Sequence, residues 1–353
     1  MLDLSALPLV LIVAIFVAAS GPIFVAGTRL CYLADAIGDR SGIDRAFMGL
    51  IFLAGITSLP ELVTTVYAAW MGSPLLALNN IFGGIVMQTA ILAVADGFVL
   101  HAVITSFPRK PTPILEGVLL ILLLSVVLAV TSVGEIAIFD YLGVAAAGLA
   151  GAYVLAIFLL RNFDLRHDWR PISLPDPGDG GAAQGAANSY RSSTISALIL
   201  SSVLASLVVV VCGTALVEAA DALAVRTSLG QGFIGVTLLA AATSMPELST
   251  TIAAVRMGAY TMAISNIFGS NLIMVLMILP ADLSFRDGAI LNFADDTTRL
   301  ALVLGILVTA IYLVGLLVKK KRRILGIGMD SMLVLILYAF SIYALFVVSR
   351  DML

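Results

Sequence analysis

The sequence predicts an all-α, polytopic membrane protein with about ten transmembrane helices in two inverted five-helix repeats. Of its 353 residues, 61% are hydrophobic and only 12% are charged, whereas soluble domains carry roughly a quarter charged residues. Apolar runs near the roughly 20 residues that cross a bilayer recur along the whole chain. The chain also resembles itself, because motifs of its first half recur in its second half at one constant offset.

Ten apolar runs are long enough to be spans, and they divide the chain into two similar halves. The predicted spans are 6–34, 46–70, 74–96, 113–133, 141–161, 194–222, 231–256, 260–280, 299–318 and 330–349. The longest polar segment, 161–193, is rich in proline and glycine and predicts a flexible cytoplasmic loop. It separates a first five-span repeat, 1–160, from a second, 194–353. Because five is odd, the second repeat enters the membrane in the opposite direction.

The distribution of Lys and Arg predicts the orientation of these spans. If the N-terminus is outside, the inner loops hold most of the 19 basic residues, including Arg109, Lys110 and the run Lys319–Arg323. Loops rich in Lys and Arg stay on the cytoplasmic side. We therefore expect an integral protein of the cell (plasma or inner) membrane, with N-terminus and C-terminus both outside. The run Lys319–Arg323 is expected to anchor this topology, with binding of anionic lipid headgroups as the alternative.

The strongest matches between the halves lie in the second and third span of each repeat. Thr57–Leu62 matches Thr243–Leu248, and Asn80–Gly83 matches Asn266–Gly269, without a gap. The same offset relates three further pairs: Gly27-Thr28 with Gly213-Thr214, Met71-Gly72 with Met257-Gly258, and Asp96 with Asp282. Inverted repeats bring such motifs together near the middle of the membrane, where the two halves can expose one site alternately to each side.

The second-span motifs, Thr57–Leu62 and Thr243–Leu248, each combine a proline with a carboxylate inside an apolar span. Pro60 and Pro246 cannot donate a hydrogen bond to the carbonyl group four residues earlier, and an unpaired carbonyl in hydrocarbon must face protein, water or an ion. The carboxylates follow directly at Glu61 and Glu247. Hydroxyl groups in the same turn come from Thr57, Ser58, Thr243 and Ser244. Carboxylate, hydroxyl and carbonyl oxygens are the ligands of Ca2+ and Na+, whereas zinc and copper prefer sulfur and imidazole.

The third span of each half carries a second set of polar candidates. Residues at i, i+4 and i+8 share one helical face: Asn80, Gly84 and Gln88 in the first half, and Asn266, Ser270 and Met274 in the second. We favour Gln88 and Ser270 as cation ligands. Asn80 and Asn266 fit coordination and helix packing equally well, because polar and small residues often join transmembrane helices.

A structural interpretation of the motifs also exists. A proline-kinked helix could hold a protonated glutamate while its Ser and Thr hydroxyls bond back to the preceding turn. Intramembrane carboxylates mark functional sites by default, however, and this motif occurs twice. The repeated glycines, Gly83 and Gly269, predict close helix contacts. For Glu116, Glu135 and Glu218, which lie near predicted span ends, we expect solvated or interfacial roles.

These residues resemble the alpha repeats of the sodium/calcium exchanger family, within the calcium/cation antiporter superfamily. That family carries G-T-S-x-P-[ED] in the second span and G-N-x-x-G-S-N-x-x-[ND] in the third, in inverted halves of a ten-span fold. The resemblance implies exchange of Ca2+ against Na+, with Glu61 and Glu247 as the central carboxylates. It also implies flanking ligands from Thr57, Ser58, Thr243 and Ser244, and from the carbonyls of the turn near Ala54 and Ala240.

The chain departs from the family pattern at several ligand positions. The glycine before Thr-Ser is Ile56 or Ala242, the third-span Ser-Asn of the first half is Gly84-Ile85, and the last polar position of the second half is Met274. Two glutamates balance one Ca2+, two Na+ or two protons, and a further buried charge is expensive. We therefore hypothesise that coupling differs from three-for-one sodium exchange, with fewer Na+ or with protons. Na+ stays the first expectation, because the G-N-x-x-E of proton-coupled relatives is missing.

Other function classes fit the sequence less well. An intramembrane hydrolase needs a nucleophile and base or a metal-bound water, but His101 and His167 lie outside the predicted spans and no H-E-x-x-H motif exists. We expect no enzyme activity and no cofactor. A channel or a non-transporting membrane protein is the alternative to an antiporter. The expected partners are inorganic cations and the lipid bilayer, with no nucleic acid and no protein partner. The first span of each half, through Gly27 and Gly213, is a candidate moving gate.

Overall fold

The computed structural model of the chain is built almost entirely from helices. It describes residues 4–41, 55, 58–97, 103–108, 111–138, 142–165, 194–256, 260–319, 323–324 and 326–351. The first half contains η1 (Leu4–Ala6), α1 (Leu9–Ser41), α4 (Leu59–Trp70), α5 (Pro74–Asp96), η3 (Ile104–Ser106), α6 (Thr112–Val133), β1 (Ala137–Ile138), β2 (Leu142–Gly143) and α7 (Val144–Leu165). The second half contains α9 (Ile195–Thr227), α10 (Gly230–Ile234), the π-helical η4 (Gly235–Leu239), α11 (Ala240–Thr243), α12 (Met245–Arg256), α13 (Tyr260–Leu276), α14 (Ile278–Ser284), η5 (Ile290–Phe293), α15 (Asp296–Val318), β3 (Arg323–Ile324), β4 (Ile327–Gly328) and α16 (Met329–Asp351).

The predicted polytopic fold is confirmed, and eight helical segments of the described chain are long and apolar enough to cross a membrane. They are Leu9–Leu30, Pro74–Asp96, Thr112–Val133, Val144–Phe163, Ile195–Thr227, Tyr260–Ser284, Asp296–Val318 and Met329–Ser349. The other two predicted spans, 46–70 and 231–256, are the second spans of the two halves. Neither is a continuous helix in the described chain, and most of 46–57 lies outside the described residues.

Both second spans break at the serine of the repeated motif. Ser58 has φ −83° and ψ 11°, and Ser244 has nearly the same backbone angles, φ −82° and ψ 8°. A new helix starts directly afterwards, with Pro60 near the start of α4 and Pro246 near the start of α12. The first turn of a helix tolerates proline because the missing N–H would have no intrahelical partner there. Hydropathy alone cannot detect this break, because the flanking residues remain apolar.

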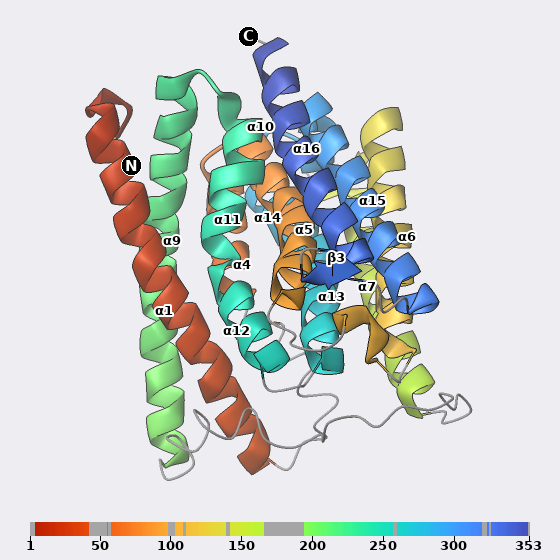
Figure 1. Ribbon diagram of the computed structural model, residues 1–353. Coiled ribbons are helices and arrows are strands. Elements are labelled where there is room, and N and C mark those ends of the chain that lie inside the picture. Colours follow the sequence, from red (N-terminus) through yellow and green to blue (C-terminus); the bar gives the residue numbers. More distant parts are fainter. Residues whose placement is uncertain are drawn as a thin grey trace.

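The two halves are inverted relative to each other. The first spans, α1 and α9, lie side by side on one flank and run in opposite directions (Figure 1). The third spans lie deepest: 89% of the apolar stretch of Pro74–Asp96 and 72% of that of Tyr260–Ser284 are buried, against 17% for Ile195–Thr227. Helix α1 begins and α16 ends at the same end of the bundle (Figure 1). This arrangement agrees with the prediction that both termini lie on the same side of the membrane. That this side is the outside stays a prediction.

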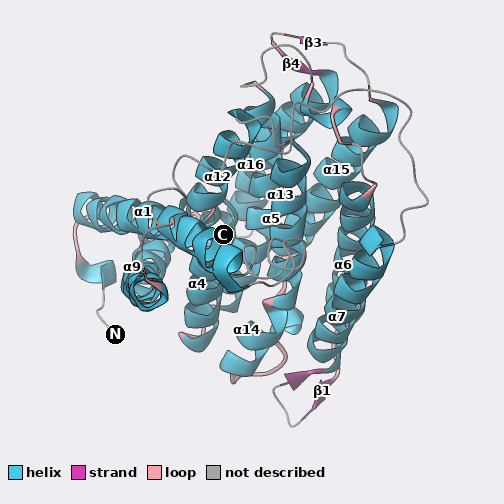
Figure 2. Ribbon diagram, turned by 90° about the horizontal axis from the view of Figure 1, so that it is seen from below, coloured by secondary structure: helices cyan, strands magenta, loops and turns pink. Residues whose placement is uncertain are grey.

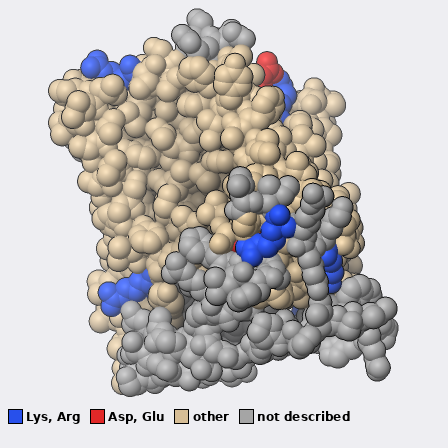
Figure 3. Space-filling view, in the orientation of Figure 1, with Lys and Arg blue, Asp and Glu red and all other residues tan. Residues whose placement is uncertain are grey.

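The outer surface is suited to lipid. Large apolar side chains stand exposed along the peripheral helices, for example Val133, Val154 and Val211. Figure 3 shows a face made mainly of uncharged residues, with few Lys, Arg, Asp and Glu side chains. Such an apolar exterior on a helical bundle agrees with burial in a hydrocarbon layer, where backbone groups are satisfied within each helix.

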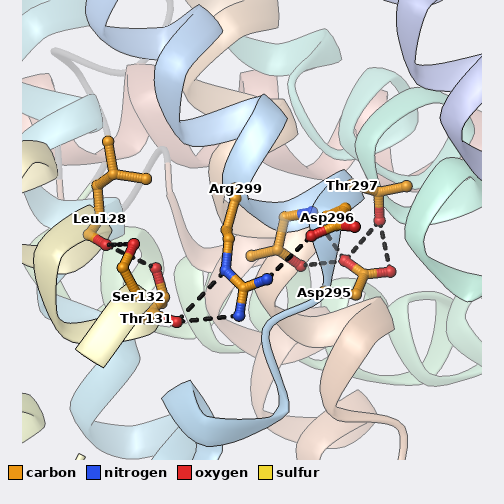
Figure 4. A network of polar contacts seen from close by, with 8 residues as sticks. Leu128, Thr131, Ser132, Asp295, Asp296, Thr297 and Arg299 are labelled. Atoms are coloured by element: carbon orange, nitrogen blue, oxygen red, sulfur yellow. Dashed lines mark hydrogen bonds and ion pairs between the residues drawn. The ribbon is translucent and has the colours of Figure 1, made fainter. Parts of the chain in front are cut away.

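The beginning of α15 joins the second half to the end of α6. Asp295 accepts a hydrogen bond from the backbone N–H of Thr298 at 2.8 Å and so caps the helix. Arg299 donates to the carbonyl oxygen of Thr131 at 3.0 Å and pairs with Asp296 at 2.9 Å (Figure 4). Carbonyl groups in the last turn of a helix lack intrahelical partners. Arg299 therefore completes the C-terminal end of α6 from the other half.

The predicted close contact at Gly83 is present. A Cβ atom on Gly83 would overlap the backbone of Val236 in η4, and it would lie 2.5 Å from the carbonyl oxygen of that residue. Gly235 beside it is also close to backbone, because its Cβ would lie 3.0 Å from the carbonyl oxygen of Leu76. Two glycines thus allow α5 to approach the π-helical segment at backbone distance. Gly269, the counterpart of Gly83, is buried in α13.

Gly83→Ala is expected to destabilise the protein by about 1–3 kcal/mol, because the added methyl group must push two backbones apart. The measurement is thermal unfolding in detergent. The matched control is Gly151→Ala on α7, where a Cβ would meet nothing within 4 Å and alanine has the better helix propensity. Equal unfolding temperatures for both variants would show that the contact carries no packing constraint.

Candidate cation site

The two repeated motifs meet in the interior of the bundle. Glu61 lies in the first turn of α4 and Glu247 in the first turn of α12, and both side chains are fully buried. Ser244, three residues before Glu247, contacts the Glu61 carboxylate. Helices that start at a broken span place their positive N-terminal ends beside these carboxylates. The inverted repeat therefore brings two carboxylates from separate halves into one region.

Hydrogen bonds cross between the halves at this point. Ser244 donates to Oε1 of Glu61 at 3.4 Å, so the second motif contacts the carboxylate of the first. Gln88, on α5, donates to the same oxygen at 3.4 Å. The hydroxyl groups of Ser58 and Ser270 lie 2.6 Å apart, which links the first motif to the third span of the second half. All five side chains are buried. The structure brings together the predicted candidates from four separate spans.

Several buried oxygen atoms around the site accept no hydrogen bond within the described part of the chain. They are Oε2 of Glu61, Oε1 of Gln88, and Oδ1 of Asn80 and of Asn271. An oxygen buried without a partner costs free energy unless something else compensates it. A hard cation coordinated by carboxylate, amide and hydroxyl oxygens would compensate it. The donor set therefore fits Ca2+ or Na+.

The remaining predicted ligands are placed differently. Thr243 is buried, and its hydroxyl bonds back to the carbonyl oxygens of Leu239 and Ala240, each at 3.2 Å. The carbonyl oxygen of Ala240 also accepts the backbone N–H of Ser244 at 3.0 Å. In this conformation both groups therefore complete the helix before the break. Ala54 and Thr57 lie outside the described residues, so their predicted ligand roles stay predictions.

The site is not symmetric, because the two third spans differ. In one half Ser270 meets Ser58, but its counterpart is Gly84, which has no side chain to meet Ser244. A Cβ atom on Gly84 would overlap the terminal methyl group of Met274 and would lie 3.9 Å from the Ser244 hydroxyl. Met274 is itself the counterpart of Gln88, so the second half has a thioether where the first half has an amide. A thioether methyl group therefore occupies the space where symmetry would place an oxygen.

The third-span asparagines have different surroundings. The amide nitrogen of Asn80 donates to the hydroxyl oxygens of Thr64 and Thr65, each at 3.0 Å, and so joins α5 to α4. The amide nitrogen of Asn80 therefore serves helix packing. Its amide oxygen is one of the buried atoms without a hydrogen bond described above. Asn271 donates to Thr89 at 3.4 Å and links α13 to α5. The hydrogen bond between Asn271 and Thr89 connects the two third spans. The pattern of one half could not predict it, because its two residues come from different halves.

The expectation for Glu116 was wrong. It is fully buried in α6, a helix that packs against α15, α13 and α7. Glu218 and Glu135 are only partly buried, as expected near span ends. Glu218 accepts the Tyr67 hydroxyl at 2.7 Å. Sequence position alone could not distinguish these three carboxylates, since all lie at similar distances from the ends of apolar runs.

Comparison with known proteins identifies a family whose members match this chain over most of its length. A family model described as "Sodium/calcium exchanger protein" matches residues 11–160 and 197–349. "Putative antiporter CaxA" of Alkalimonas amylolytica is 26% identical over 304 residues, 84% of this chain and 87% of that protein. The solved H+/Ca2+ exchanger CAX has a TM-score of 0.71 at 15% identity, covering 97% of this chain and 86% of its own. The sodium-calcium exchanger NCX_Mj has a TM-score of 0.59 at 16% identity, covering 95% and 99%. With its duplicated motifs meeting inside an inverted helical bundle, the chain belongs to the sodium/calcium exchanger family.

Proposed function

We propose that this protein is a secondary active antiporter that exchanges Ca2+, or a similar divalent cation, for Na+ by alternating access. One observation carries the proposal: Ser244 of the second motif donates to the fully buried Glu61 of the first, and Glu247, three residues after Ser244, is fully buried as well. Buried carboxylates inside a membrane protein are costly and mark ion pathways. A cation held by both halves at once can be released to either side when the halves exchange conformations.

The two carboxylates set the charge that the site can neutralise. One Ca2+, two Na+ or two protons each balance Glu61 and Glu247. The empty site would leave two negative charges in a low-dielectric interior, at an effective cost of several kcal/mol for each ion. The unloaded protein should therefore change conformation much more slowly than the loaded one. This difference makes the transport of one ion depend on the return of another, as antiport requires.

We infer further that fewer than three Na+ are exchanged for each Ca2+. The methyl group of Met274 fills the space beside Gly84, so Ser244 lacks the serine partner that Ser58 has in Ser270. A third Na+ would lack both a balancing carboxylate and a complete set of ligands. Protons are the second candidate for the counter-ion, because a proton on a glutamate needs no shell of surrounding oxygens.

Radiolabelled Ca2+ uptake into proteoliposomes tests the exchange directly. We expect saturable uptake into vesicles loaded with Na+, because outward movement of Na+ drives inward movement of Ca2+. Little uptake is expected when Na+ is equal on both sides, because no Na+ gradient then drives the exchange. A pH gradient without Na+ is the control that separates the two counter-ions, and uptake driven by it alone would establish proton coupling instead. Uptake that needs no counter-ion inside the vesicle would indicate a channel and contradict antiport.

A further inference from the structure

The repeated aspartates at the ends of the third spans are not part of the cation site. Asp96 is the last residue of α5 and is fully buried. Its Oδ1 accepts the backbone N–H of Ile104 at 2.6 Å, and its Oδ2 accepts the backbone N–H of Gly328 at 2.5 Å. Ile104 belongs to the same half, but Gly328 belongs to the other. One carboxylate thus fastens the end of α5 to the hairpin β3–β4 that precedes α16.

Asp282 makes the mirrored arrangement. It is fully buried in α14, and its Oδ1 accepts the backbone N–H of Ile290, eight residues later, as Asp96 does with Ile104. Its Oδ2 accepts the backbone N–H of Gly143 at 2.6 Å, in the hairpin β1–β2 that precedes α7. The end of the second half's third span is therefore fastened to the first half. The two connections are reciprocal.

A second carboxylate stands beside each connection. A Cβ atom on Gly328 would overlap Oδ1 of Asp330, and a Cβ atom on Gly143 would overlap the carboxylate of Glu135. Both glycines have ordinary negative φ angles, so here glycine is needed for space. Asp330 accepts the Thr105 hydroxyl at 2.5 Å, which adds another link between the halves. Burial and the charge of Asp282 raise the pKa of Glu135.

The two connections lie at opposite ends of the bundle. Helix α6 separates the loop of Ile104 from the hairpin β1–β2, and its 22 residues span about 33 Å at 1.5 Å per residue. Figure 2 likewise shows β1 at one end of the α6 and α15 group and β3–β4 at the other. Each third span carries candidate ion ligands, Gln88 on α5 and Ser270 on α13. A shift at either fastened end would displace those side chains relative to the opposite half.

We propose that Asp96 and Asp282 are reciprocal clamps that hold each ion-binding third span against the other repeat and thereby set ion affinity without touching the ion. This inference rests on the proposed cation site. A carboxylate suits the task because it can accept two backbone N–H groups at once, whereas an asparagine side chain offers one acceptor and turns an N–H group toward the other donor. The clamps stay closed throughout transport, since both lie away from the first spans α1 and α9.

Asp96→Asn and Asp282→Asn test the positioning role in the full-length protein in proteoliposomes. We expect each variant to raise the half-saturating Ca2+ concentration by about tenfold, as loss of an outer-shell partner does at metal sites, with the maximal rate retained. The matched control is Asp295→Asn, which removes the same charge from a helix cap within one half. Unchanged half-saturation in both clamp variants, with an active unmodified protein, would overturn the clamp alone. An unmodified protein without Ca2+ transport would instead overturn the proposed function.

Cross-linking tests whether a clamp stays closed. Thr105→Cys with Asp330→Cys, in a background with Cys31→Ala and Cys212→Ala, places two thiols at a contact between the halves. We expect equal transport rates before and after oxidation of the same sample. Transport that stops on oxidation and returns on reduction would show that this joint opens, and the proposal would fail. When Asp96→Asn is added to this cysteine pair, Ca2+ affinity should be low before oxidation and should recover when the disulfide forms. A residue that served only general stability would not give this recovery.

Discussion

Replacing Glu61 with glutamine is expected to stop Ca2+ transport while the protein remains folded and inserted. Glutamine keeps the shape of the side chain and one acceptor oxygen, but it removes one of the two charges that balance Ca2+. An uncompensated buried charge costs about 3–5 kcal/mol, which corresponds to a loss in affinity of about a hundredfold or more. The measurement is radiolabelled Ca2+ uptake by Na+-loaded proteoliposomes over a wide range of Ca2+ concentrations.

The duplication of the glutamate motif gives this experiment a strong internal comparison. Glu247→Gln should produce a loss of similar size, because both carboxylates are fully buried and the motifs that carry them are in contact. Asp287→Asn is the control, since Asp287 is exposed in the loop after α14. Near-normal uptake by Glu61→Gln would remove that residue from the site. A loss in only one of the two glutamate variants would mean that the motifs do not share one ion.

The features that the sequence predicted are those that depend on local patterns and on symmetry. Hydropathy predicted the helical membrane fold, and the odd number of spans in each repeat predicted the inversion. Once two repeats are inverted, equivalent motifs must approach the same depth, so the meeting of Glu61 with Ser244 follows from their positions in the motif. The backbone break could be suspected from Pro60 and Pro246. The exact position of the break, at the serine two residues before each proline, could not be predicted, because the proline could lie within a kinked helix or in the first turn of a new one.

Contacts between distant elements could not be predicted in the same way. The burial of Glu116 depends on how closely other helices pack on α6, and no periodicity within α6 reveals that distance. The repeated Asp96 and Asp282 were visible as a matched pair, but their partners Gly328 and Gly143 lie in short hairpins without a repeated motif. The overlap of Met274 with the space at Gly84 likewise joins two positions that only the packing of α5 against α13 brings together.

Gly84→Ser combined with Met274→Gln is expected to increase the number of Na+ exchanged for each Ca2+. Serine at position 84 would face Ser244, as Ser270 faces Ser58, and glutamine at position 274 would repeat Gln88. Both changes are needed, because a Cβ at position 84 displaces the end of the side chain at position 274, and a displaced glutamine, unlike methionine, still offers an oxygen to the ion. The added oxygens would give a further Na+ its missing ligands. The ratio is measured in proteoliposomes from the Na+ and Ca2+ gradients at which net Ca2+ flux stops at a series of membrane potentials. This point does not depend on the potential for two Na+ and does for three, and we expect the ratio to rise from two toward three.

The single variants separate chemistry from sterics in this last test. Gly84→Ser alone should weaken Ca2+ transport without changing the ratio, because the methionine must move aside into the site. Met87→Gln is the matched control: it changes another methionine of a third span, whose sulfur contacts the Tyr338 hydroxyl at 3.3 Å, and should leave the ratio unchanged. A ratio of three in the unmodified protein, or no change in the double variant, would show that Met274 does not limit the number of bound ions. The asymmetry of the two repeats would then be a feature of packing alone.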